Sequence, residues 1–377
     1  MTKIFNSFED CCGCSACADV CPKNAIQMKS VDGFLYPQVD ARLCVECGLC
    51  EKVCPFKKEK KQGSNCIQAY ALQALDKDVL MASSSGGAFT LLSDEVLEQG
   101  GVVYGASYDG AMVVTHHRAE TKNQRNAMRG SKYIQSDATG IYRQVREDLQ
   151  SGRKVLFSGT PCQVAGLKAF LGRDYENLIC VDILCHGVPN PKLWQDFVSH
   201  LEKLYGKKLK DYSFRDKTVS WKQYSAKLTF EDGSVEGNNP LTGSYIELFR
   251  YDVCLRPACT RCPYTGTNRE GDITVGDFWG VEKALPEVDT AGGISAVMVR
   301  SHKGMELMNR VKPRARLWEC QETQIAAGQP NMSRPSQLSN KAEAFQADWK
   351  TRNFEKVLKK YTCVGIRRRI KDFIKSL

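Results

Sequence analysis

Eight cysteines near the N-terminus fall into two runs with the same spacing. Each run has three cysteines separated by two residues, then a fourth cysteine three residues later, followed directly by proline. A tight loop of this kind brings three thiolates to one iron–sulfur cubane, while the fourth cysteine ligates the cubane of the other run. The spacing predicts two 4Fe–4S clusters, one held by Cys11, Cys14, Cys17 and Cys54 and the other by Cys44, Cys47, Cys50 and Cys21.

A pair of zinc sites is the alternative for these cysteines. Zinc sites usually combine two C-x2-C pairs or include histidine, whereas each run here is continuous and the first histidine in the chain is His116. We therefore interpret the N-terminal part as a two-cluster ferredoxin module that moves electrons one at a time. Cys12 is left over from the pattern and is expected to be a spare thiol.

Four further cysteines lie at predicted turns and strand ends of the remaining chain. Cys162 stands at a turn from a strand into a helix, and Cys185 ends the next strand. Because ligand sites form outside the carboxyl ends of parallel strands, these two thiols are expected to converge. Together with the C-x2-C pair Cys259 and Cys262 they could supply four ligands to one metal centre. Buried structural cysteines are the alternative.

Other residues suggest weaker hypotheses. The small residues of SSSGGAFTLL (83–92) open a predicted helix, where free N–H groups and the helix dipole would suit a phosphate, although an ordinary cap looks the same. His116 and His117 are adjacent on a predicted strand, so their side chains point to opposite faces and surface positions are expected. His186 could donate a hydrogen bond to a cluster sulfur or a flavin.

The elements that must position these residues alternate between strand and helix. Such alternation favours an α/β core with parallel strand pairing. Residues 211–238 differ, because the turn Glu231-Asp232-Gly233 between strand-like runs predicts a hairpin, so the sheet is expected to be mixed. The predicted strands are 102–104, 154–159, 177–185 and 272–280, and the predicted helices are 86–99, 163–172 and 191–205.

Composition limits the class of protein. The 377 residues are 42% hydrophobic and 25% charged, which is ordinary for a soluble globular chain. No apolar run approaches the roughly 18 residues of a membrane span, and the N-terminus lacks a secretory profile. A cytoplasmic protein is predicted, whose 18 cysteines serve metals rather than disulfides. Three cubanes of charge about −2 would reduce the formal +10 to about +4, and no nucleic-acid partner is expected.

Six segments resemble, in the same order, the coenzyme F420 hydrogenase/dehydrogenase beta-subunit family. They extend over about residues 67–300, and the ferredoxin module in front matches the fused members of that family. The last motifs look like the bacterial branch, so the fold is expected to transfer further than the substrate. The segments are SSSGGAFT, RGSKYIQSD, FSGTPCQVAGLK, VDILCHGVP, LRPACTRC and DITVGDFWG.

The resemblance implies a flavoprotein that binds FAD next to a third 4Fe–4S cluster, in a mixed-sheet α/β catalytic domain. The ligands of that cluster would be Cys162, Cys185, Cys259 and Cys262, with Cys254 in reserve. No acid–base residue is identified. The FAD contacts would be Ser85, Gly86, Gly87, Thr90, Lys132, Tyr133, Gly276 and Asp277.

The expected function is that of an iron–sulfur flavoprotein oxidoreductase. It would pass electrons between a two-electron carrier or substrate, coenzyme F420 among the candidates, and a redox partner protein or ferredoxin. The alternative is a non-catalytic electron-transfer subunit that serves a separate catalytic chain.

The expected domains are a ferredoxin domain at 1–56, a linker at 57–66, beta-subunit regions at 67–150 and 151–330, and a basic tail at 331–377. Apolar residues recur at helical spacing in the tail, beside cations. A terminal helix there would pack on the body or lie peripherally on an anionic membrane surface. These apolar residues are Ile366, Ile370, Phe373, Ile374 and Leu377.

Overall fold

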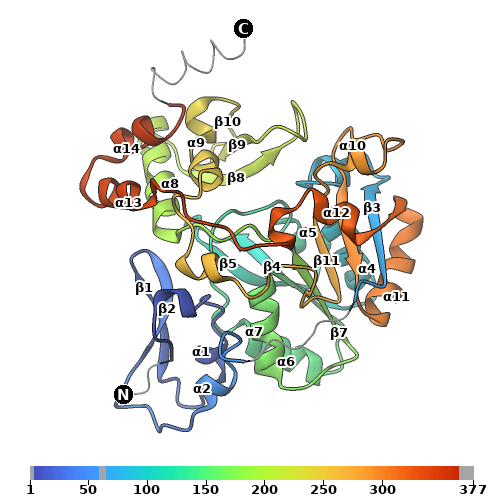
Figure 1. The fold of residues 1–377 in the computed structure, drawn as a ribbon, viewed down its shortest axis with the longest axis horizontal. Helices are drawn as coiled ribbons and strands as arrows, with labels where there is room; N and C mark the ends of the chain where they lie inside the picture. Colours follow the sequence, from blue (N-terminus) through green and yellow to red (C-terminus); the bar gives the residue numbers. More distant parts are fainter. Residues whose placement is uncertain (1–3, 59–64, 365–377) are drawn as a thin grey trace.

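The structure is a computed structural model that describes residues 4–58 and 65–364. Figure 1 shows a small N-terminal module beside a larger body. In the module, β1 (Ile26–Val31) and β2 (Phe34–Val39) form an antiparallel hairpin. Asp32 and Gly33 at its turn both have positive φ, as the twist of a two-residue hairpin requires. The short helices of the module are η1 (Phe8–Asp10), α1 (Ala16–Val20) and α2 (Leu49–Lys52).

One eight-stranded sheet forms the centre of the body, in the order β13-β3-β12-β11-β7-β6-β4-β5. The four neighbours β11, β7, β6 and β4 run parallel, and the remaining pairs are antiparallel. The predicted mixed-sheet α/β architecture is therefore confirmed. The strands are β3 (Gln68–Ala74), β4 (Val102–Tyr108), β5 (Val114–Ala119), β6 (Val155–Gly159), β7 (Leu178–Ile183), β11 (Ile273–Asp277), β12 (Ser295–Val299) and β13 (Ala315–Cys320).

Helices cover both faces of this sheet. Leu91, Leu92 and Val96 of α4 (Ala88–Glu98) pack with α11 (His302–Val311) on one face. On the other face α6 (Ile141–Gln150) and α7 (Pro161–Leu171) share a core with the module, since Cys14 and Val53 belong to the same cluster. Strand β7 is buried except at Ile183, as its continuous apolar run predicts.

The predicted hairpin is present, but it does not join the main sheet. β8 (Leu209–Asp216), β9 (Ser225–Phe230) and β10 (Val235–Gly237) form a separate three-stranded antiparallel sheet. The apolar face of that sheet packs against Trp194 and Phe197 in a second core. The helices of this layer are α8 (Pro191–Tyr205), α9 (Pro240–Arg250), α13 (Ala342–Thr351) and α14 (Phe354–Tyr361).

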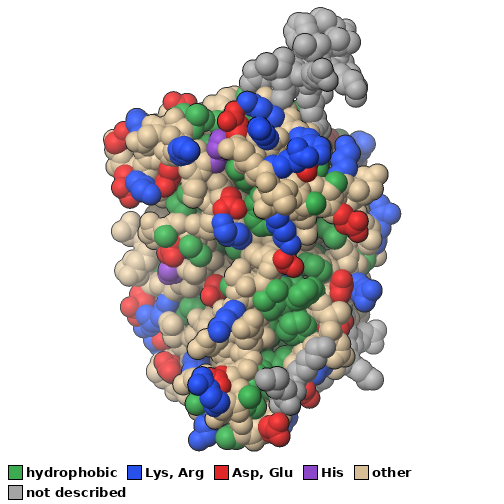
Figure 2. Space-filling model, turned by 90° about the vertical axis from the view of Figure 1, so that its left-hand side faces the viewer, with side chains coloured by type: hydrophobic (Ala, Val, Ile, Leu, Met, Phe, Trp, Pro, Cys, Tyr) green, Lys and Arg blue, Asp and Glu red, His purple; other side chains and the backbone are tan. Residues whose placement is uncertain are grey.

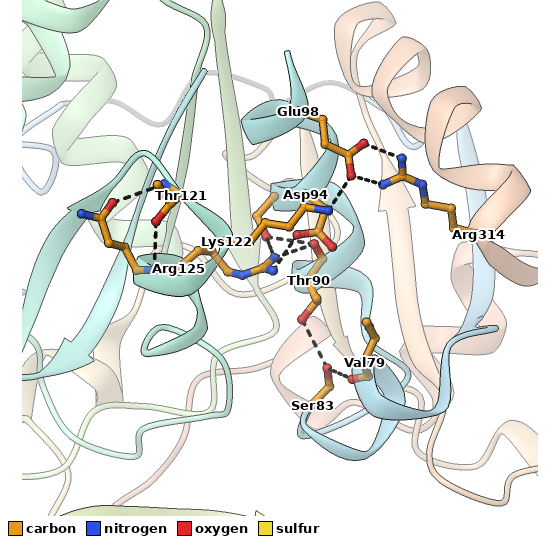
Figure 3. Close-up of polar contacts among 11 residues, drawn as sticks. Val79, Ser83, Thr90, Asp94, Glu98, Thr121, Lys122, Arg125 and Arg314 are labelled. Atoms are coloured by element: carbon orange, nitrogen blue, oxygen red, sulfur yellow. Dashed lines mark hydrogen bonds and ion pairs between the residues drawn. The ribbon is translucent and has the colours of Figure 1, made fainter. Parts of the chain in front are cut away.

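Shorter elements fill the edges of the body. Figure 3 shows the polar contacts that join α5 (Lys122–Asn126) to α4. The buried Arg125 donates to the carbonyl of Thr90 at 2.7 Å and pairs with Asp94 at 2.6 Å, and the hydroxyl of Thr90 lies 3.4 Å from that of Ser83. These contacts fix the loop that precedes α4. The other short helices are α3 (Lys77–Met81), η2 (Pro257–Arg261), α10 (Val281–Ala284), η3 (Lys312–Arg314), α12 (Glu322–Ala327) and η4 (Pro330–Met332).

The N-terminal module is bound to α6 through polar contacts. The carboxylate of Asp19 accepts hydrogen bonds from the N–H groups of Gly140 at 2.6 Å and Tyr142 at 2.9 Å. Arg143 donates in return to the carbonyls of Asp19, Ala18 and Cys21. A carboxylate at a helix N-terminus also interacts favourably with the helix dipole. These bonds hold the module in one position on the body.

The surface in Figure 2 carries basic and acidic side chains side by side, with one hydrophobic patch at the level of the N-terminal module. In the part of the chain that the structure describes, no helix is long and apolar enough to cross a membrane. The predicted C-terminal helix at 366–377 and part of the predicted linker lie outside the described residues.

Candidate functional site

The two cysteine runs of the module fold into matching loops. In each loop the second and fourth residues after the first cysteine have positive φ, namely Gly13 and Ser15 in one run and Glu46 and Gly48 in the other. Left-handed residues at these positions turn the chain tightly, so that the thiols of one run face a common point. The repeated spacing in the sequence thus corresponds to a repeated backbone conformation.

Each predicted set of four cysteines lines one small cavity. One cavity is lined by Cys11, Cys14, Cys17 and Cys54, and a second by Cys21, Cys44, Cys47 and Cys50. Cys54 thus lines the cavity of the first run, and Cys21 lines the cavity of the second run. The outer cavity is the more accessible one, because Cys47 is exposed whereas Cys14 and Cys17 are buried.

Burial keeps the inner thiols neutral unless a metal is bound. It raises the pKa of Cys11 to about 11 and also raises the pKa values of Cys17 and Cys54. Thiolates are the form that ligates iron, so metal binding must supply the stabilisation that the buried environment withholds.

A third cavity is lined by the four cysteines predicted for the body. Cys162 lies in the first turn of α7, Cys185 follows β7, and Cys259 and Cys262 lie in and directly after η2. Because β6 and β7 are parallel, their carboxyl ends bring Cys162 and Cys185 to the same edge of the sheet. Burial raises the pKa of Cys185 and raises that of Cys259 to about 12.

The reserve candidate Cys254 is not brought to this cavity. It is buried in the hydrophobic core of the three-stranded layer, with Tyr245 and Trp194. Among residues 4–58 and 65–364, no three cysteine, histidine or carboxylate side chains are grouped so that they could hold a single metal ion.

Cys12, expected to be a spare thiol, lines both the cavity of Cys11 and the cavity of Cys162. Hydrogen bonds with Cys14 and with Cys162 raise the pKa of Cys12, and the bond from Cys12 lowers the pKa of Cys162. Cys14 approaches α7 closely, since a Cβ on Gly166 would lie 2.9 Å from its sulfur.

A much larger cavity, of about 500 Å³, adjoins the third one. Its volume is in the usual range for a ligand site. The segment from Cys185 to Val188 and the side chain of Asn331 line both cavities. Of the residues predicted to contact FAD, the large cavity is lined by Ser85, Gly87, Thr90, Lys132, Tyr133, Gly276 and Asp277.

Gly86 is the exception among those residues. A Cβ at this position would lie 1.9 Å from the carbonyl oxygen of Leu72, and its N–H donates to the Ser295 hydroxyl at 2.9 Å. Gly86 therefore packs against β3 and fixes the start of α4, while Gly87, with φ of 96°, caps the helix. The first turn of α4 faces the cavity through Ala88 and Phe89.

The walls of the large cavity are basic and aromatic. Arg129, Arg250 and Arg269 line it, while Asp277 is the one carboxylate among the described lining residues. That carboxylate pairs with the buried Arg215 at 2.8 Å. The wall also contains Trp279, which stacks on Trp221 with ring centroids 5.1 Å apart.

Individual wall residues are held by the surrounding structure. Lys132 donates to the carbonyl of Arg129 at 3.0 Å, and burial lowers its pKa to about 8. Tyr133 stacks on Phe249, with ring centroids 4.5 Å apart. Both side chains are thus fixed before any ligand enters.

Two histidines, His116 and His186, line the large cavity. His116 is buried, lies 3.1 Å from the Ser158 carbonyl and 3.0 Å from the Ser136 hydroxyl, and lines the cavity, so the prediction of a surface position was wrong. The ring of His116 stacks on Phe157. His116 is buried because its strand, β5, pairs with β4 of the main sheet. His186 contacts Asp252 at 2.5 Å and Asn331 at 3.2 Å, so its ring nitrogens do not bind cysteine sulfur. Burial by itself lowers the pKa of His186, but the hydrogen bond and the negative charge of Asp252 outweigh this effect, so the pKa is raised above its ordinary value.

Comparisons with known proteins identify two family domains in the chain. Residues 10–58 match the 4Fe-4S dicluster domain, and residues 152–324 match the C-terminal domain of the beta subunit of coenzyme F420 hydrogenase/dehydrogenase. A chain in the F420-reducing NiFe hydrogenase complex from Methanosarcina barkeri is similar in structure, with a TM-score of 0.48 and 17% sequence identity over 74% of this chain and 92% of that chain.

Two curated proteins are similar over shorter segments. One is the isethionate sulfite-lyase activating enzyme of Oleidesulfovibrio alaskensis, 32% identical over 23% of this chain and 27% of that protein. The other is an uncharacterized ferredoxin of Methanocaldococcus jannaschii, 44% identical over 12% of this chain and 25% of that protein. The match thus spans about a quarter of the length of each relative. The chain joins a 4Fe–4S dicluster domain to a domain of the coenzyme F420 hydrogenase/dehydrogenase beta-subunit family, and it is an iron–sulfur protein related to an oxidoreductase subunit.

Proposed function

We propose that this protein is an iron–sulfur flavoprotein oxidoreductase with three 4Fe–4S clusters and one FAD. Electrons would pass between a two-electron carrier or substrate, with coenzyme F420 a candidate because of the family name, and an external one-electron partner such as a ferredoxin. The contact of the large cavity with the third cysteine cavity, through Cys185, is the observation that carries this proposal.

The third cluster would be held by Cys162, Cys185, Cys259 and Cys262. Four thiols around one cavity supply the ligand number of a cubane, and they come from the edge of the sheet where ligands bind in α/β proteins. Cys254 is left out of the proposed ligand set because it lies in a hydrophobic core.

FAD would occupy the large cavity. Its pyrophosphate needs cations and free N–H groups, and the wall offers Arg129, Lys132 and the first turn of α4. Ser85, Gly87, Thr90, Tyr133, Gly276 and Asp277 would complete the contacts, with Gly86 acting through the backbone position of Gly87. When bound, FAD supplies the exchange between paired and single electrons. Trp279 and Tyr133 present fixed aromatic surfaces to a planar ring system.

The outer cavity of the module is proposed as the entry for the external partner. Cys47 is exposed there, so a protein docked at this surface would come close to the cluster held by Cys21, Cys44, Cys47 and Cys50.

For the domain division we propose 1–56, 67–150, 151–330 and 331–377 with a linker at 57–66, although strands from both sides of residue 150 share the main sheet.

The test is a set of anaerobic reduction assays on the full chain. Oxidised F420, NAD+ and NADP+ are each offered with reduced ferredoxin or reduced viologen as the electron donor, and reduction of the flavin and of the carrier is followed by absorbance, with Cys185→Ala as the variant that breaks the proposed route. Turnover with one two-electron carrier that is lost in Cys185→Ala supports an enzyme. Bound clusters and FAD with no turnover, together with a stable complex with a second chain, would instead indicate a non-catalytic electron-transfer subunit.

A further inference from the structure

Arg256 lies fully buried where the N-terminal module meets the body. Its Nε donates to the carbonyl of Cys11 at 2.7 Å, and its Nη2 donates to the carbonyl of Leu35 at 3.0 Å and lies 3.7 Å from the sulfur of Cys11. Its Nη1 donates to Gln135 Oε1 at 2.9 Å. The same side chain lines the cavity of Cys162, so one guanidinium faces two cysteine sets.

Within the described part of the chain, the guanidinium of Arg256 has no carboxylate partner. Each of the other buried arginines pairs with an acidic residue; these are Arg125, Arg215, Arg269 and Arg300. Its additional contacts are rings, with the centroid of Tyr36 at 4.1 Å and that of Phe34 at 5.6 Å. A buried charge without a counter-charge is costly. Thiolate-ligated cubanes are anionic, and a cubane on either side would provide the counter-charge that the protein itself does not.

Cys12 occupies the gap between the same two cysteine sets. It lines both cavities and hydrogen-bonds with Cys14 on one side and Cys162 on the other. Its thiol is not needed by either set of four. Cys12 therefore lies at both cysteine cavities without being assigned to either set of ligands.

We propose that Arg256 and Cys12 form the junction between two clusters, the core cluster and the cluster held by Cys11, Cys14, Cys17 and Cys54. At this junction Arg256 is a positioning residue that raises the reduction potential of the cluster of Cys11. The proposal rests on the third cluster of the proposed function. The exchange moves one electron from one cubane to the other, with no bond formed or broken and no proton transferred. The external one-electron partner supplies or removes that electron through the outer cluster.

The test is a redox titration of the anaerobic full-length protein, followed by electron paramagnetic resonance. Positive charge and hydrogen bonds to sulfur raise cluster potentials, so Arg256→Gln should lower the potential of the cluster of Cys11. We expect at least a tenfold change in its one-electron reduction equilibrium, which corresponds to about 59 mV, with iron content unchanged. Arg256→Lys, which keeps the charge, should restore part of the shift.

Arg125→Lys is the matched control, since it alters an equally buried arginine that bonds only to α4 (Figure 3). It should leave every cluster potential unchanged even if stability falls. If Arg256→Gln does not accumulate, Arg256→Met, which also removes the charge, is titrated in its place, and unchanged potentials in it overturn the proposal. Unchanged potentials in a folded, fully loaded Arg256→Gln protein overturn it as well. A wild-type chain with eight irons would instead refute the third cluster.

Cys12 is tested in the same titration. Cys12→Ala removes the polar side chain that lies at both cavities and should lower the potential of the core cluster, while Cys12→Ser keeps a small polar group there and should return that potential toward the wild-type value. Both variants should retain the wild-type iron content. Loss of four irons from Cys12→Ala would make Cys12 a ligand and overturn its role as a junction residue.

Discussion

Asp19 of the N-terminal module accepts a hydrogen bond from the backbone N–H of Tyr142, at 2.9 Å, in the first turn of α6. A second bond from Gly140 at 2.6 Å makes the carboxylate the cap of a helix that belongs to the body. Asp19 is therefore one of the buried side chains that hold the module, and with it the two sets of cysteine cavities, in position.

Replacement of Asp19 by Ala should loosen the module. Hydrogen bonds to a charged group contribute about 1.5–3 kcal/mol, so the opening free energy of this interface should fall by roughly 2 kcal/mol. Hydrogen exchange of α1 and α6 amides measures it. Asp40→Ala, which removes an acid bonded to the exposed Arg42, is the control within the same module. Equal protection in both variants would show that Asp19 does not hold the module.

Cys185→Ala should remove the core cluster alone. We expect iron to fall from about twelve to about eight atoms per chain, counting four for each cubane, because the two module cavities do not include Cys185. Cys254→Ala is the matched control, because Cys254 is a cysteine of the body that lies in a hydrophobic core and not at the cavity. Iron content and electron paramagnetic resonance measure the difference. Equal loss of iron in Cys254→Ala would reverse the ligand assignment.

The cysteine sets could be predicted because their spacing is local. A C-x2-C-x2-C-x3-C run can close a loop around a cubane whatever the rest of the chain does, and β6–α7 and β7 have the order that brings Cys162 and Cys185 together. The residues missed at the site have the opposite character. Arg256 and Cys12 lie at a cysteine cavity of the other domain only because the module docks on the body. No local sequence pattern encodes that docking.

Other differences between the sequence predictions and the structure also come from contacts between distant segments. His116 is buried because β5 pairs with β4 and its ring stacks on Phe157, a contact between distant segments. The hairpin at Glu231-Asp232-Gly233 was correctly predicted from turn chemistry, but its sheet is separate because α8 offers an apolar face. Gly86 was assigned to the ligand, whereas its lack of a Cβ serves the close approach to Leu72.

Lys132→Met should weaken FAD binding at least tenfold, or about 1.4 kcal/mol. The substitution removes a half-buried cation from the wall and keeps an unbranched side chain of similar length. Fluorescence titration of the flavin-depleted protein measures the affinity. Lys192→Met, on α8 and paired with Asp196, should bind FAD as the wild type does. An unchanged affinity in Lys132→Met would place the phosphate elsewhere.

His116 should make stability depend on pH. Burial lowers its pKa to about 4 from an ordinary value of 6.5, so the folded protein holds the neutral ring, and the unfolded chain gains a proton first as the pH falls. The stabilisation is present above pH 6.5 and decreases toward pH 4. Between pH 7 and pH 5 the loss should be about 2 kcal/mol.

Thermal unfolding at several pH values measures this effect. His116→Gln should be less stable at pH 7 and should show a smaller fall in Tm between pH 7 and pH 5 than the wild type. An equal fall in both proteins would assign the pH dependence to other groups.

The most direct test of a cubane beside a flavin is a count of iron, acid-labile sulfide and FAD in anaerobically purified full-length protein. About twelve irons, as many sulfides and one FAD per chain are expected. Eight irons with no flavin, or zinc in place of iron in the cavity of Cys162 and Cys185, would contradict it.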